Sequence, residues 1–205
     1  MTKPAKNYQM SFSTGGLFVN ESVAVARLHA AGSDWKQTIL LALGDGATSL
    51  PKSASNRRTL REIANRVSCL TEEERTFLID DADRPEQEAL LWLATCRAYR
   101  FVREFAVEVI QDRFLSFRLD LPLSAFDHFL DAKAEWDDDL GKLNPSTKLK
   151  LRQVLFRILR EAGILDVSDH IRPAYLSFRL KTLIASHNPQ ELLYFPGLRP
   201  EKGVA

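Results

Sequence analysis

The sequence predicts a mainly α fold: a multi-helix bundle with helix-turn-helix-like elements and a small β-hairpin wing in its C-terminal part. Most segments between glycines and prolines carry apolar residues at the i, i+3, i+4, i+7 spacing of an amphipathic helix. Residues that start helices precede several of these segments. Strand-like patterns are few and fall around residues 164–171 and 175–178, where we expect the wing.

The first half of the chain predicts four helices. Residues 17–31 form the first, which follows the potential N-cap residues Ser13 and Thr14 and ends at Gly32. Asp34 can cap a second helix over residues 35–43, and a third covers residues 56–70. Thr71 followed by Glu74 has the spacing of a capping box, which predicts a fourth helix over residues 72–82.

The second half begins with an apolar periodicity over residues 85–115, which is longer than a typical globular helix. It is either one central core helix or two helices in near continuity. Ser124 is the expected cap of a helix over residues 125–136. A basic helix then opens at residues 144–147 and ends at residues 162–163, and the tail from Pro189 onward is expected to be irregular.

The bulk composition is that of an ordinary soluble protein, with 205 residues, 45% hydrophobic and 27% charged. We expect an N-terminal helical subdomain, residues 1–83, and a C-terminal one, residues 84–205, with a winged-helix-like segment at 144–181. No secretory signal and no apolar run of the ~20 residues that span a bilayer are present, so we predict a cytoplasmic protein without membrane contact. A monomer is favoured.

The net charge of +1 hides a strong segregation of charge along the chain. Residues 52–66 carry five basic side chains against one acidic, and residues 144–181 carry eight against three. The compensating acid lies at residues 72–88 and 135–139. Because the local field decides whether a polyanion is attracted, the two basic segments indicate an anion-binding surface.

The basic helix after Asn144 is the stronger of the two candidates. Its core face and its outward face are separate, and the outward face has no carboxylate before Glu161. A helix face that is merely exposed to solvent usually carries both acidic and basic side chains, which form i, i+4 ion pairs. Gln153 and Arg157 are types that read base edges, whereas Lys150 and Arg160 suit phosphates.

The second basic helix, over residues 57–70, repeats this design, although for that helix alone a solvated face is the favoured interpretation. The wing is expected to add Arg172 and other basic side chains that reach phosphates or the minor groove. The predicted DNA-binding residues are therefore Lys148, Lys150, Gln153, Arg157, Arg160, Arg172, Arg58, Arg61 and Asn65.

Nothing in the sequence argues for catalysis. Nucleophile motifs such as GxSxG are absent, and the four histidines and two cysteines show no metal-ligand spacing. The acidic run at residues 137–139 lacks the glycine and the spaced partners of a calcium loop. We expect no catalytic residue, no metal and no cofactor.

Three strings of residues carry a resemblance to a known family. They are MSFSTGGLF at residues 10–18 with Glu21 and Ser22, LWLA at residues 91–94 leading into CR at 96–97 and YRFVREF at 99–105, and AKAEW at 132–136 followed by residues 149–163. On these residues the chain resembles the BrxA family of BREX phage-defence systems over nearly its whole length.

The resemblance implies a mainly helical, non-enzymatic accessory protein that binds double-stranded DNA. Its partners would include other BREX proteins, such as the methyltransferase and the ATPases. The family is similar in part to helical RNA-binding antitermination proteins, so RNA binding is an alternative. A further alternative is a protein-interaction scaffold of the defence complex without direct DNA binding.

Overall fold

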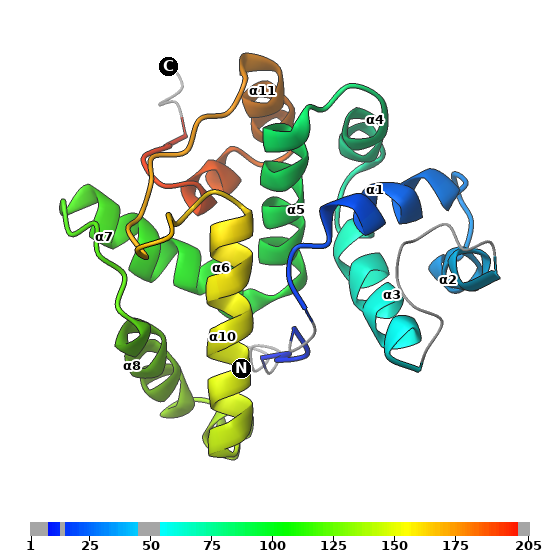
Figure 1. Cartoon of the computed structure of the whole chain (residues 1–205). Coiled ribbons are helices and arrows are strands. Elements are labelled where there is room, and N and C mark those ends of the chain that lie inside the picture. The colour runs from blue at the N-terminus through cyan, green and yellow to red at the C-terminus, as the bar shows by residue number, and fades with distance from the viewer. Residues whose placement is uncertain (1–7, 13–14, 45–53, 201–205) are drawn as a thin grey trace, which may run out of the picture.

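The computed structural model describes residues 8–12, 15–44 and 54–200, and the predicted mainly α architecture is confirmed (Figure 1). Helix α5 (Arg84–Ala98) runs through the middle of the molecule. It contacts α1 (Val19–Leu28), α3 (Ala54–Val67) and α4 (Glu72–Asp80) on one side and α10 (Pro145–Glu161) on the other. Its eight buried residues, Ala89 to Cys96, explain why this stretch is apolar on every face.

The four N-terminal helices lie where the sequence predicts them, with α2 (Trp35–Gly44) in contact with both α1 and α3. Helix α1 begins at Val19, two residues later than expected, and its N-cap residue Phe18 has a positive φ of 54° and makes no side-chain cap hydrogen bond. Ser13 and Thr14, the predicted caps, lie outside the described residues. The capping box of α4 is confirmed: the Thr71 hydroxyl accepts from Glu74 N–H, and the Glu74 carboxylate accepts from Thr71 N–H.

The long apolar region is divided, so the two-helix alternative is the right one. Helix α5 ends at Tyr99, whose extended backbone (φ −124°, ψ 105°) turns the chain before α6 (Arg100–Phe105). A π-helical turn, η1 (Ala106–Gln111), and α7 (Asp112–Leu115) continue α6. Tyr99 is completely buried, so the break between α5 and α6 lies in the core.

The C-terminal half contains α8 (Leu123–Ala134), α9 (Asp138–Gly141), α10, α11 (Phe178–His187) and the 3₁₀ turn η2 (Pro189–Tyr194). Helix α8 has Pro122 at its N-cap, so Ser124 lies inside the helix and the predicted cap is wrong. Helix α10 has the predicted start: the side chain of Asn144 accepts from Thr147 N–H. The sequence does not predict α11 or η2. Ser177 caps α11 by accepting from Leu180 N–H.

The predicted β-hairpin wing is not supported. Around residues 164–172 the described chain has only two isolated antiparallel bridges, Leu165 with Ile171 and Asp120 with His170. Prolines limit both ladders, because Pro173 and Pro122 follow the bridged segments and have no N–H to donate. The segment is docked against residues 119–121 rather than projecting, and the predicted second strand at 175–178 leads directly into α11.

A single apolar cluster extends through both halves of the chain, from Phe12 to Phe195. Trp92 in α5 is fully buried, and its indole N–H donates to the carbonyl of Tyr194 in η2 over 2.9 Å. The division into subdomains 1–83 and 84–205 coincides with the turn between α4 and α5, and their independent folding stays a prediction.

The predicted caps at Thr71 and Ser124 can be compared directly by mutation. We expect Thr71→Ala to lower the free energy of unfolding by about 1 kcal/mol, because the first turn of α4 loses its side-chain acceptor. Ser124→Ala is the matched control, and its effect should stay within about 0.5 kcal/mol, since Ser124 is exposed and caps nothing. Urea unfolding followed by circular dichroism measures both, and equal losses would contradict the assignment of the caps.

Candidate nucleic-acid interface

The outward face of α3 carries three exposed arginines, Arg57, Arg58 and Arg61. None of the three has an ion-pair partner among the described residues. Their i, i+3 and i, i+4 spacing places them within one turn of each other, where like charges repel. Arg57 also lies in the first turn of the helix, where the helix dipole disfavours cations. An anion bound at this face would relieve both unfavourable terms.

The basic side chains of α10, unlike those of α3, form ion pairs with carboxylates from neighbouring elements. Lys148 pairs with Asp131 of α8 at 3.2 Å, and Arg152 pairs with Asp127 of the same helix. The sequence shows no acid on this face of α10 before Glu161, but the acid comes from α8, which packs beside it. Near α8 the face is therefore largely neutralised.

The C-terminal half of α10 is also neutralised, by Glu161 of the same helix and by Asp169 of the segment that follows it. Arg157 pairs with Glu161 at 2.7 Å, and Arg160 makes a bidentate pair with Asp169, at 2.8 Å to one oxygen and 2.9 Å to the other. Arg157 also lines a polar cleft of about 380 Å³ that contains more carboxylates than cations. Phosphate would have to displace these partners, so Arg157 and Arg160 are weaker candidates than the exposed arginines of α3.

Beyond α3, three predicted residues make no ion pair in the described part of the chain. Lys150 and Gln153 are exposed on α10, and Arg172 is exposed just after the bridged segment. Arg179, a basic residue expected in the wing, lies on α11 instead and pairs with Asp81 at 2.5 Å. Arg57 is not among the predicted site residues, although its i, i+4 spacing from Arg61 is visible in the sequence.

Asn65, the last predicted contact on α3, takes part in a network below the surface. Its amide donates to the hydroxyl of Tyr99 over 3.2 Å, and that hydroxyl donates to Glu62 over 2.6 Å. Burial, together with the Glu62 carboxylate, raises the pKa of Tyr99 to about 12, so the hydroxyl stays a donor. Glu62 also pairs with the buried Arg66 at 2.7 Å. The network fixes α3 on the core and leaves the exposed arginines outside.

The N-terminal segment Gly15–Phe18 lies between α3 and α10 (Figure 1). The guanidinium of Arg66 donates to the carbonyl of Gly16 over 2.9 Å. On the other side, Leu17 N–H donates to the carboxylate of Glu161. A Cβ atom at Gly16 would lie 2.2 Å from that carboxylate, so a larger residue there would push the Glu161 side chain away from Leu17 N–H. This segment, which we call the strap, joins the two basic helices.

Across residues 8–12, 15–44 and 54–200, no three His, Cys, Asp or Glu side chains converge to hold a metal ion. Burial raises the pKa of the thiols of Cys69 and Cys96 above the ordinary value. Within the same residues, no helix combines the length and apolarity that crossing a bilayer requires.

Comparison with known proteins gives a consistent result. The BrxA family model matches residues 6–188. A protein of Escherichia coli O9:H4 (strain HS) named "BREX protein BrxA" is 24% identical over 186 residues, which is 87% of this chain and 84% of that protein. The crystal structure of an uncharacterized protein from Magnetospirillum magneticum superposes with a TM-score of 0.74 at 21% identity, covering 92% of this chain and 97% of the other. The last likeness shows a shared fold. Because the family model covers most of the chain, this protein belongs to the BrxA family.

Proposed function

We propose that this protein is a non-enzymatic, double-stranded-DNA-binding accessory component of a BREX-type bacteriophage-resistance system. Its place in such a system follows from the family, together with the name of the E. coli relative, most of whose length it covers. Other BREX proteins are then its expected partners, with the methyltransferase and the ATPases foremost.

One observation carries the DNA-binding part of the proposal. The exposed arginines of α3, Arg57, Arg58 and Arg61, stand without carboxylate partners among the described residues, whereas many other exposed arginines are in ion pairs. Helix α3 has 14 residues and is about 21 Å long, which is long enough to follow a groove or several phosphates of a duplex. Arginines in this arrangement bind phosphates regardless of base sequence.

The few candidate base readers predict limited sequence specificity. Gln153 and Asn65 are the exposed amides of the two basic helices, and Asn65 already donates to Tyr99. Affinity should therefore come from phosphate neutralisation and counterion release. Non-specific duplex binding of this kind is enough for an accessory factor whose target is selected by another component.

A salt titration with a labelled duplex of about 20 base pairs tests the proposal. With three or four phosphates neutralised by α3 and Lys150, log Kd should rise with log salt with a slope of about 3–4. Between about 50 and 200 mM NaCl, affinity should then fall by about 100-fold. Fluorescence anisotropy gives the slope directly.

Competitors and a cleavage control complete the experiment. An A-form RNA duplex of the same length should compete more weakly than DNA, and equal competition would favour the RNA-binding alternative. Plasmid incubated with the protein and Mg²⁺ or Mn²⁺ should stay intact, since we expect no nuclease activity. Absence of duplex binding at about 50 mM NaCl would remove DNA from the proposal and leave the scaffold interpretation.

A further inference from the structure

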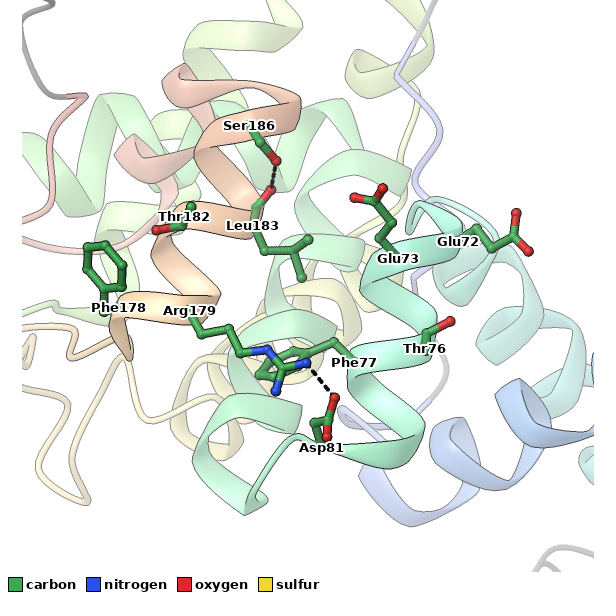
Figure 2. Close-up of a pocket in the computed structure, with 10 residues that line it drawn as sticks. All are labelled: Glu72, Glu73, Thr76, Phe77, Asp81, Phe178, Arg179, Thr182, Leu183 and Ser186. Atoms are coloured by element: carbon green, nitrogen blue, oxygen red, sulfur yellow. Dashed lines mark hydrogen bonds and ion pairs between the residues drawn. The ribbon is translucent and has the colours of Figure 1, made fainter.

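A largely apolar groove lies between α4 and α11, on elements that the basic surface does not use (Figure 2). Its volume is about 620 Å³, and Phe77, Leu183 and Phe178 contribute apolar surface to its walls. Phe178 is exposed and Leu183 is half-buried, so apolar surface of this groove is open to solvent, and such a surface marks a candidate interaction site. Apart from Phe77, which is 4% exposed, this apolar surface is open in the described part of the chain.

The two helices that form the groove run in opposite directions. At one end Arg179 of α11 pairs with Asp81 of α4 and stacks over Phe77, 4.7 Å from the ring centroid. At the other end the groove continues as a second hollow of about 410 Å³, which begins beside Thr71 and His187. Each helix is about 14 Å long, so the groove has the length of a helix of about three turns.

The open end of the groove has an acidic rim. Glu72 and Glu73 line both hollows, are exposed, and have no basic partner among the described residues. The dipole of α4 favours carboxylates in its first turn, which explains their presence at a helix start. The dipole does not explain the apolar channel beside them. Apolar walls with an unpaired acidic rim are complementary to an apolar stripe flanked by lysines or arginines.

We propose that this groove binds an amphipathic helix with basic flanks, supplied by a partner protein. Its apolar residues at i, i+3, i+4 and i+7 would pack against Leu183 and Phe178, and its lysines or arginines would pair with Glu72 and Glu73. The inference does not rest on the proposed DNA binding. Carboxylates repel phosphates, so the acidic groove and the basic α3 face suit different ligands and could be occupied together.

The test uses a defined probe, a fluorescein-labelled peptide of about 14 leucine and lysine residues with helical amphipathic spacing. A peptide of the same composition in scrambled order keeps the charge and removes the apolar stripe. The full-length chain should bind the amphipathic peptide at least about tenfold more tightly than the scrambled one by fluorescence anisotropy. The methyl NMR signals of Leu183 should shift on titration, which locates the peptide.

Two variants alter the groove without touching the core. Thr76→Trp fills the groove from an exposed position, and Glu72→Lys/Glu73→Lys reverses the charge of the rim. Each should weaken peptide binding by at least about tenfold. Glu135→Lys/Asp138→Lys is the charge-matched control in the other acidic block and should bind like the wild type. An unchanged circular dichroism spectrum and Tm of Thr76→Trp show that this variant is folded.

Three results would overturn the proposal. Equally tight binding of the scrambled and the amphipathic peptide would reduce the interaction to charge. Equal binding by wild type and Thr76→Trp would place the peptide elsewhere. A wild type that is dimeric in sedimentation equilibrium, and that Thr76→Trp makes monomeric, would assign the groove to a second copy of this chain.

Discussion

The substitution Arg97→Met is expected to lower the free energy of unfolding by about 3–5 kcal/mol, the largest effect of any single change considered for this protein. Arg97 of α5 lies between two buried carboxylates, Glu74 of α4 at 2.5 Å and Glu191 of η2 at 2.7 Å. Burial alone would lower the pKa of the guanidinium, but its hydrogen bonds to both carboxylates outweigh this effect and raise the pKa. Methionine fills similar space and leaves two buried carboxylates without a positively charged partner.

For a chain of this size, that loss corresponds to a fall in Tm of roughly 6–20 °C. Arg84→Met is the matched control, because Arg84 pairs with Glu88 at an exposed position and should cost less than about 1 kcal/mol. Adding Glu74→Gln and Glu191→Gln to Arg97→Met should recover part of the loss, since the uncompensated charges are then gone. If the triple variant is no more stable than Arg97→Met, the cost arises from packing rather than charge.

The second large effect is expected on duplex DNA binding. Arg58→Ala/Arg61→Ala should reduce affinity at about 100 mM NaCl by about 10- to 50-fold and lower the salt slope by about 2, because each arginine neutralises one phosphate. Both side chains are exposed and unpaired among the described residues, so their removal leaves no buried group unsatisfied. Circular dichroism should therefore show an unchanged Tm, and anisotropy titrations give the affinity and the slope.

Two further variants locate the interface. Arg58→Lys/Arg61→Lys keeps the charge and should keep most of the affinity, because phosphate binding depends mainly on charge. Arg157→Ala/Arg160→Ala removes the same charge from α10, but from arginines already paired with Glu161 and Asp169, and should cost less than about fivefold. A greater loss for the α10 variant than for the α3 variant would return the interface to α10, the stronger candidate by sequence.

The sequence predicts most helices because their signals are local. The capping box at Thr71 and the N-cap at Asn144 need only residues within one turn, and both are present. The start of helix α11 was not predicted, because its N-cap residue Ser177 lies in a short aromatic segment, Tyr175 to Phe178, whose sequence resembles a strand. The prediction of a β-hairpin wing failed because of a tertiary contact. Residues 169–171 pair with residues 119–121, which are distant in the sequence and which no local pattern identifies as the partner.

The charged surface is harder to predict than the fold. The sequence of α10 contains no acidic residue before Glu161. In the structure, however, Asp127 and Asp131 of the neighbouring helix α8 form ion pairs with Arg152 and Lys148, respectively. Pairing between elements depends on which faces meet, and one helix's sequence does not contain that information. For α3 the outcome is the opposite, because no acidic neighbour pairs with its exposed arginines in the described chain.

The strap also constrains the order in which the protein can be assembled during synthesis. Leu17 and its acceptor Glu161 are 144 residues apart. At about 5–20 residues per second, a ribosome needs roughly 7–30 seconds to make the residues between them. Arg66, which donates to the carbonyl of Gly16, is made about a third of the way through that interval, but the N–H of Leu17 still has no acceptor. Although the strap precedes α1 in the sequence, its contact with α10 therefore forms only after α10 has been made.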